Sequence, residues 1–270
     1  MRRTTGMMGL IGATFLLAAP AAAQVSWTTQ EDDRRCEDRG DSDRERWCEL
    51  REAVLAAPSA LQIDAGNNGG VEVSGAVRSD VRVRAHIWAS ARTEERAHEI
   101  VSQVELEIEG GRFAAQGPEG ARREYWGVDW ELEVPRAIDV EAHTMNGGIA
   151  IADVSGNLDF DATNGGIELT GVAGDVRGRT TNGGVHVELA GTRWEGRGLD
   201  AETTNGPVTL VVPDGYGAEL EASTTNGGFD VDFPVTVRGR LGRTLRTTLG
   251  DGGPLIRATT TNGGVRIRRR

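Results

Sequence analysis

Five aspartates in the second half of the sequence are candidates for carbohydrate chemistry, because glycoside hydrolysis uses two carboxyl groups held a short distance apart. They are Asp159, Asp161, Asp175, Asp230 and Asp232. Asp159 and Asp161 alternate with apolar residues, so both are expected to point outward from one strand. The positions expected beside them in neighbouring repeats carry Arg179 and Glu202. The pattern therefore favours solvated strand faces over a catalytic carboxylate pair.

The histidines do not have the spacing of a metal site, since none lies within ligand spacing of another. They are His86, His98, His143 and His186. The repeated Asn-Gly-Gly units lack the aspartate of calcium-binding nonapeptide repeats. The sequence also contains no nucleophile elbow, Walker loop or dinucleotide fingerprint. We therefore expect no enzyme activity, no metal and no cofactor.

Two cysteines, Cys36 and Cys48, are the only ones in the chain. If the protein is exported, an oxidising compartment makes a disulfide between them the default expectation. A metal or redox pair is the alternative, but no histidine lies nearby and the spacing is not C-x-x-C. We expect the disulfide to be structural.

The first 23 residues have the features of a secretory signal peptide, with cleavage expected between Ala23 and Gln24. Arg2 and Arg3 precede an apolar run that is too short to span a bilayer, and no later run is long enough either. The protein is therefore expected to be exported, to the periplasm, the cell surface or the medium. Removing the two arginines changes the formal charge from −11 to −13, which opposes binding to nucleic acid.

Residues 24–60 begin as a charged leader and become amphipathic at "WCELREAVLAAP". This pattern predicts a short helix that the disulfide clips to the leader and that Pro58 ends. From Leu61 onward, apolar and polar residues alternate, which predicts half-buried strands. One further helix is expected at about 93–104, with Thr93 as its N-cap and apolar residues at helical spacing.

A repeat marked by Asn-Gly dominates the rest of the chain. Its asparagines are Asn146, Asn164, Asn182, Asn205, Asn226 and Asn262. An earlier copy, "GNNGGVEV", contains Asn67 and Asn68 and precedes the predicted helix. The steps are 18, 18, 23, 21 and 36 residues, and a last step of twice 18 predicts one unit without the mark. A period near 18 is typical of stacked repeat folds.

Two architectures fit strands joined by Asn-Gly. Antiparallel hairpins use this dipeptide often, but they do not require successive turns to match. A parallel β-solenoid stacks each coil on its equivalent, so the same residue types return at the same place. We therefore predict a β-solenoid in which the six asparagines form a structural turn ladder. Asn and the first Gly would supply left-handed backbone conformations at each corner, and the threonines that precede Asn would point outward.

The units "TNGG-(I/V)-x-(V/L)", the strand "W-x-L-x-V-P" from Trp130 to Pro135 and "GDGG" before the final "TTTNGGVRI" resemble the putative adhesin family of bacterial exported proteins. The resemblance covers about residues 61–270. It implies a parallel β-solenoid domain, of largely unknown function, at the cell envelope. It implies no catalytic residues.

The leading hypothesis is a non-enzymatic exported scaffold for surface interaction, adhesion or envelope organisation. Its expected partners are an envelope protein, a polysaccharide or a second copy of the chain. One alternative is a carbohydrate-active β-helix enzyme. Another is a periplasmic ligand-sensing domain with a pocket near Trp126 and Trp130, between the helix and the first coils.

Overall fold

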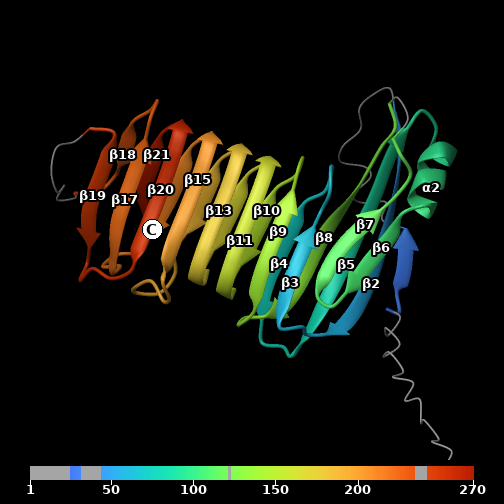
Figure 1. Ribbon diagram of the computed structural model, residues 1–270, viewed down its shortest axis with the longest axis horizontal. Helices are drawn as coiled ribbons and strands as arrows, with labels where there is room; N and C mark the ends of the chain where they lie inside the picture. The colour runs from blue at the N-terminus through green and yellow to red at the C-terminus, as the bar shows by residue number, and fades with distance from the viewer. Residues whose placement is uncertain (1–24, 32–43, 121–122, 235–241) are drawn as a thin grey trace, which may run out of the picture.

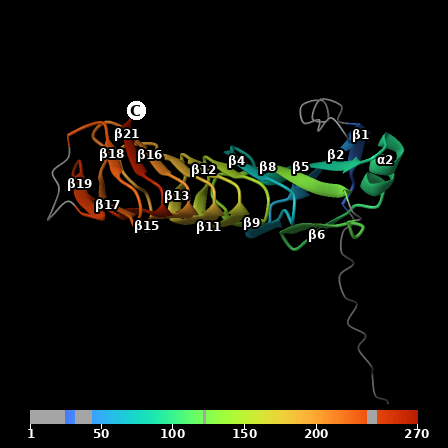
Figure 2. The same cartoon turned by 90° about the horizontal axis from the view of Figure 1, so that it is seen from above.

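The computed structural model describes residues 25–31, 44–120, 123–234 and 242–270. Two sheets form two layers along the molecule, and the helix lies at one end (Figure 1, Figure 2). In spatial order, sheet A contains β1 (Thr28–Glu31), β2 (Glu45–Ala56), β5 (Asp80–Ala91), β8 (Tyr125–Pro135), β4 (Val71–Ala76), β10 (Ile149–Ala152), β12 (Ile167–Thr170), β14 (Val185–Glu188), β16 (Val208–Val212), β21 (Val265–Arg269) and β18 (Phe229–Val231). Sheet B contains β19 (Thr244–Leu249), β17 (Ala218–Thr224), β20 (Leu255–Asn262), β15 (Gly198–Asn205), β13 (Ala173–Asn182), β11 (Ser155–Asn164), β9 (Asp139–Thr144), β3 (Ala60–Asp64), β7 (Arg112–Gln116) and β6 (Glu105–Glu109).

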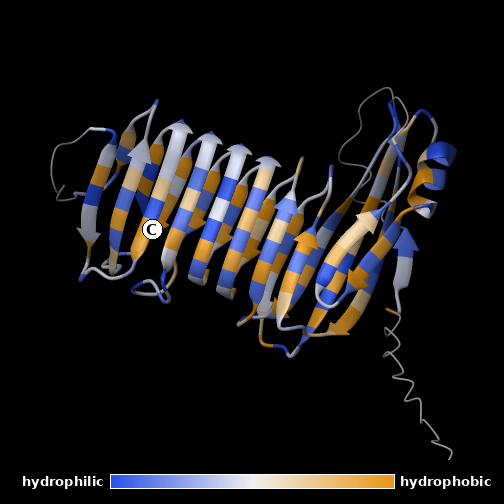
Figure 3. Ribbon diagram, in the orientation of Figure 1, coloured by the Kyte–Doolittle hydropathy of each residue, from blue (hydrophilic) through white to orange (hydrophobic). Residues whose placement is uncertain are grey.

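Each Asn-Gly repeat unit contributes one strand to sheet B and the next strand to sheet A. Equivalent strands of different units pair in parallel and in register, as Asn164 does with Asn182 and Ile167 with Val185. Hydrophobic and hydrophilic residues alternate along the strands of both sheets (Figure 3). The prediction of an all-β protein with mostly parallel strands and one helix is thus confirmed.

The core lies between the sheets. Inward side chains at equivalent positions of successive strands form rows that run along the molecule. One such row, fully buried, contains Val71, Ile149, Ile167, Val185, Val208 and Val265. Burial of an aliphatic side chain of this size contributes about 1.5–3 kcal/mol relative to exposure. The repeated apolar pattern therefore fixes which face of every strand points inward.

An insertion separates the first repeat unit from the second. Strands β3 and β4 form the unit of Asn67 and Asn68, and they pair with β9 and β10 of the next unit. The segment between β4 and β9 adds β5, α2 (Glu94–Ser102), β6, β7 and β8. The predicted helix is confirmed, including its N-cap, where Thr93 accepts a hydrogen bond from the backbone N–H of Arg96. Its buried face packs on β2 and β5.

The helix predicted at residues 47–58 is wrong, because this segment forms the strand β2. β2 pairs antiparallel with β5 over its whole length, from Glu45 opposite Ala91 to Ala56 opposite Asp80. This ladder of cross-strand contacts outweighs a helical spacing that is only weakly specific. Cys48 is buried on β2, whereas Cys36 and the predicted signal peptide lie outside the described residues.

The prediction of an unmarked repeat unit after Asn226 is also wrong. The last unit in the sequence, β20 and β21, lies between earlier units: β20 pairs with β15 and β17, and β21 pairs with β16 and β18. β19, which follows β18 in the sequence, pairs antiparallel with β17 at the edge of sheet B. The 36-residue step therefore reflects a change in the order of stacking. The C-terminal arginines lie inside sheet A and do not cover its end.

Candidate functional site

The structure brings the six asparagines of the repeat into one column at the corner between the sheets. Nδ2 of each asparagine donates a hydrogen bond to Oδ1 of its spatial neighbour, at 2.8–2.9 Å. The order along the column is Asn146, Asn164, Asn182, Asn205, Asn262, Asn226. Asn146 in turn donates to the backbone carbonyl of Asn67 at 2.6 Å. The side chains are exposed, yet their amides are joined to one another.

The first glycine of each Asn-Gly-Gly is required by close stacking, and the predicted left-handed conformation is wrong. None of these glycines has a positive φ, and neither do the column asparagines. A Cβ on Gly165 would instead lie 1.8 Å from the carbonyl oxygen of Gly147, and one on Gly147 would lie 2.0 Å from that of Gly69. The second glycine is less restricted, since a Cβ on Gly148 would meet no atom closer than 3.5 Å. Pro207 occupies this second position in one unit.

Inward threonines tie each corner to the next. Their hydroxyls donate to the carbonyl of the first glycine in the adjacent unit, at 2.5–2.8 Å, and the donors are Thr144, Thr180, Thr203, Thr224 and Thr260. Ala162 occupies the equivalent position in β11. The threonines that precede the column asparagines, such as Thr181 and Thr204, are exposed, as the alternation indicated. The corner thus has the hydrogen bonding of a structural element.

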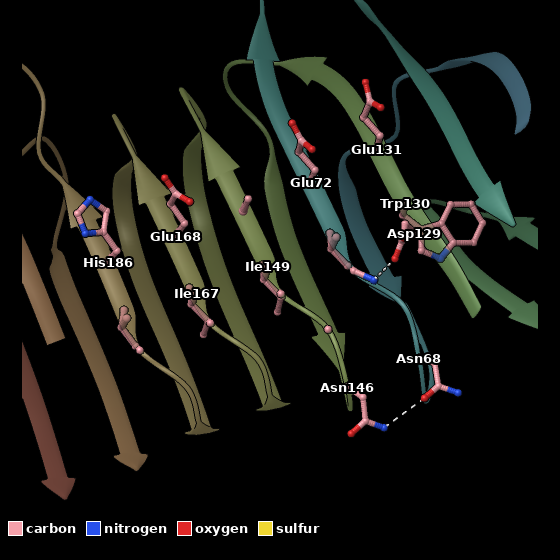
Figure 4. A pocket seen from close by; sticks show the side chains of 18 of the residues that line it. Asn68, Glu72, Asp129, Trp130, Glu131, Asn146, Ile149, Ile167, Glu168 and His186 are labelled. Atoms are coloured by element: carbon pink, nitrogen blue, oxygen red, sulfur yellow. Dashed lines mark hydrogen bonds between the residues drawn. The ribbon is translucent and has the colours of Figure 1, made fainter. Parts of the chain in front are cut away.

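A groove on the outer face of sheet A is a candidate binding site that sequence reasoning missed. It crosses the strands from β5 to β16, has a volume of about 630 Å³, and is shown in Figure 4. We call it the sheet A groove; its lining includes Glu72, Trp88, Asp129, Ala150, Glu168 and His186. Glu72, Ala150, Glu168 and His186 are direct neighbours on successive parallel strands. These residues lie far apart in the sequence, so only alignment of the repeats could have suggested the row.

Asp129 in the wall of the groove shows how a hydrogen-bond acceptor can reach a backbone N–H group of this row. Oδ1 of Asp129 accepts a hydrogen bond from the backbone N–H of Gly70 at 2.8 Å (Figure 4). At the position equivalent to Asp129, the following strands carry glycine, beginning with Gly70 itself and Gly148. Within the described part of the chain, the N–H groups of Gly148, Gly166 and Gly184 donate to no protein acceptor. The groove therefore presents backbone donors toward solvent.

Arginines neutralise the carboxylates at the β8 end of the groove. Nη1 of Arg84 donates to Glu131 at 2.5 Å, and Nε2 of His86 lies 3.2 Å from the same carboxylate. Burial acts to raise the pKa of Glu131, but these contacts together outweigh it and lower the pKa below its ordinary value. The hydrogen bond from Arg82, aided by Arg84, likewise lowers the pKa of Glu52. Both groups therefore stay ionised at neutral pH.

The structure does not bring the five candidate aspartates together. Asp159 and Asp161 point outward from β11, but Asp230 and Asp232 lie at the end of sheet A, where Asp230 pairs with Arg268. Asp175 pairs with Arg197 at 3.3 Å. The sequence predicted only Arg179 and Glu202 beside Asp159 and Asp161. In the structure, Asp159 lies beside Glu141 on β9 and beside Arg177 on β13. Asp159 and Asp175 line a second hollow of about 250 Å³ on sheet B.

The histidines are dispersed as well. His86 and His186 line the sheet A groove, His98 packs edge-on against Trp47, and His143 lies 3.7 Å from Asp161. Among the residues that the structure describes, no three His, Cys, Asp or Glu side chains are grouped as metal ligands would be. No helix in the described ranges has the length and apolar character that a membrane crossing needs.

The tryptophans named for a ligand-sensing pocket occupy different environments. Trp130 is buried, and its ring centroid lies 5.8 Å from that of Phe113 in an edge-on contact. Trp126 donates from Nε1 to the carbonyl of Pro118 and lines a hollow of about 630 Å³ between the β3–β4 corner and the β7–β8 loop. Helix α2 contributes nothing to that hollow. The pocket expected between the helix and the first units is therefore not formed by these residues.

Comparison with known proteins gives a family and several distant structures. The family model described as Toastrack DUF4097 matches residues 61–268. A putative cell adhesion protein from Clostridium sporogenes is 9% identical, with 82% of this chain and 100% of that chain covered and a TM-score of 0.46. A putative adhesin from Bacteroides fragilis is 10% identical, with 82% and 97% covered and a TM-score of 0.38. A putative lipid binding protein from Parabacteroides distasonis is 10% identical, with 84% and 98% covered and a TM-score of 0.30. None of the curated proteins matches the chain.

Proposed function

This chain belongs to the Toastrack DUF4097 family, and on that premise we propose that it is an exported, non-enzymatic β-solenoid that binds a partner at the cell envelope. The binding surface in this proposal is the outer faces of the two sheets. Export rests on the signal-peptide features of residues 1–23. Periplasm and cell surface are both consistent with it.

The observation that carries the proposal is the pairing of equivalent strands across the repeat units. Every unit adds one strand to each sheet in parallel register, and this pairing supports the proposed β-solenoid. Stacking of this kind extends the outer faces without deepening the core. Long exposed faces built on a rigid array suit recognition of an extended partner.

The electrostatics of three carboxylates disfavour each of them as a general acid. A general acid in glycoside hydrolysis needs a raised pKa. Arginine hydrogen bonds lower the pKa of Glu52 and Glu131, and hydrogen bonds from the backbone and side chain of Asn157 lower that of Asp139. These carboxylates are suited to ion pairs and hydrogen bonds with a ligand.

The experiment is co-sedimentation of the purified chain, starting at residue 24, with envelope fractions and insoluble polysaccharides from a bacterium that produces it. We expect the chain to sediment with at least one of them. Analytical ultracentrifugation of the protein alone tests self-association. If the chain binds neither envelope, polysaccharide nor itself, the proposed function is wrong.

A carbohydrate-active enzyme is kept as a second candidate because of one observation. Glu141 and Asp159 are direct neighbours on adjacent strands of sheet B, where strand spacing is about 4.8 Å, close to the separation of about 5 Å in retaining glycosidases. Release of reducing ends from polysaccharides by the wild type, abolished in Asp159→Asn, would support it. If the wild type releases none, this candidate is eliminated.

A further inference from the structure

We propose that the sheet A groove binds a neutral oligosaccharide chain that lies across the strands, an inference that rests on the binding function proposed above. The groove runs along the stacking direction of the units, from β5 to β16. Its lining combines hydrogen-bond donors, acceptors and one indole, and the following observations assign the ligand class.

The donors are backbone groups in fixed positions. Gly148, Gly166 and Gly184 have N–H groups that no protein acceptor uses within the described ranges. Asp129 shows the accessible geometry, because its carboxylate reaches the N–H of Gly70 from the outer face. Over the next strands, glycine replaces Asp129, so the space that its side chain would fill belongs to the groove. An oxygen of a bound ligand can occupy this space and accept from each glycine in turn.

The acceptors stand beside those donors. Glu72 and Glu168 are exposed on β4 and β12, and the small Ala150 lies between them on β10. A hydroxyl group both donates and accepts, so a polyhydroxylated chain satisfies glycine N–H groups and carboxylates together. A ligand with carboxylates or sulfates of its own is disfavoured by Glu72, Glu168 and the formal charge of −11.

The shape of the groove agrees with a chain of sugar rings. Neighbouring strands in a sheet are about 4.8 Å apart, which is comparable to the length of one hexose in an extended chain. Successive rings would thus meet the equivalent glycine N–H groups of successive strands. Trp88, half-buried on β5 with the Arg46 guanidinium 5.1 Å from its ring centroid, offers the rest of its aromatic surface for packing against the C–H face of a sugar ring.

The test is isothermal titration calorimetry of the full mature chain with soluble oligomers of glucose, mannose or N-acetylglucosamine, and with oligogalacturonate as the anionic probe. Ala150→Tyr fills the groove from an outward position. Thr259→Tyr makes the same change on the outer face of sheet B and is the matched control. Glu168→Gln removes one acceptor with little change of shape. Circular dichroism establishes that each variant is folded.

We expect at least one neutral oligomer to bind, at least about tenfold weaker binding by Ala150→Tyr and Glu168→Gln, and unchanged binding by Thr259→Tyr. Oligogalacturonate is expected not to bind. Equal binding by the wild type and both groove variants would overturn the assignment of the site, and preference for oligogalacturonate would overturn the ligand class. If the wild type binds envelope fractions but no neutral oligomer, this inference fails while the proposed function stands. If the wild type binds no neutral oligomer, no envelope fraction, no insoluble polysaccharide and no second copy of itself, both proposals fail.

Discussion

Nδ2 of Asn262 donates a hydrogen bond to Oδ1 of Asn205 at 2.8 Å, although the two residues are 57 positions apart. On its other side, Asn262 accepts from Asn226, which precedes it in the sequence. The last repeat unit in the sequence therefore lies in space between the units of Asn205 and Asn226, which both precede it in the chain. The units of Asn205 and Asn226 do not contact each other through this ladder, and the final segment joins them.

Truncation after Pro254 is expected to disrupt the C-terminal end of the fold. It removes β20 and β21, which supply the neighbours of both β15 and β17. The buried Ile256, Ala258, Val265 and Ile267 would be lost from the core. At about 1.5–3 kcal/mol for a buried aliphatic side chain, the loss is comparable to the stability of a whole domain. Hydrogen exchange should then show β17, β18 and β19 without protection.

Truncation after Ile267 is the control for this experiment. It removes only Arg268, Arg269 and Arg270, whose ion pairs with Asp230, Asp214 and Glu188 are exposed. Exposed ion pairs contribute little to stability because solvent and salt screen them, so protection of β17 should persist. If both truncations behave alike, the last repeat unit is not what holds this end together.

Gly147→Ala is expected to destabilise the protein strongly, whereas Gly148→Ala should be tolerated. The new Cβ at position 147 would overlap the carbonyl of Gly69, while at 148 it meets only ordinary contacts. Separating two stacked corners breaks hydrogen bonds on both sides, so we expect a loss of about 3 kcal/mol or more for Gly147→Ala. Urea unfolding gives both values, and similar midpoints for the pair would contradict the steric argument.

Ala162→Thr is expected to stabilise the protein. The position is buried and lies between Thr144 and Thr180 in the same row. A hydroxyl there would donate to the carbonyl of Gly147, as Thr180 does to Gly165. The gain should be about 1 kcal/mol. Ala162→Val has the same shape without the donor, so thermal unfolding of the two variants isolates the hydrogen bond, and equal melting temperatures would exclude it.

The sequence predicted those features that each repeat specifies by itself. Alternation identifies the inward residues, and Thr93 with the following apolar positions specifies α2. The spatial order of the units could not be predicted, because each unit presents the same strand edges and the same asparagine. The unit that contains Asn262 and the unit that contains Asn226 could each stack beside the unit of Asn205, and the repeated motif does not distinguish the two.

The sheet A groove was missed for a related reason. Glu72, Ala150 and Glu168 differ from one unit to the next, so no repeated motif marks them. Their proximity depends on the parallel register of β4, β10 and β12, and the insertion adds Asp129 and Glu131 of β8 beside β4. β2 was mispredicted because its partner β5, which determines its conformation, lies outside the window in which helical spacing is judged.

Glu131→Gln is expected to reduce stability at neutral pH and to matter less in acid. Contacts with Arg84 and His86 lower the pKa of Glu131 in the folded protein, so the carboxylate stabilises the fold above its unfolded pKa of about 4.3. That contribution disappears as the pH falls through the folded pKa. We expect a difference of about 1–2 kcal/mol from the wild type at neutral pH, shrinking as the pH falls below about 4. Glu141→Gln, at an exposed position where the carboxylate accepts a 3.3 Å hydrogen bond from Gln62, should change stability by less than about 0.5 kcal/mol at neutral pH. Denaturant unfolding at several pH values measures these differences, and a constant loss for Glu131→Gln across the series would show that its charge is not the stabilising feature.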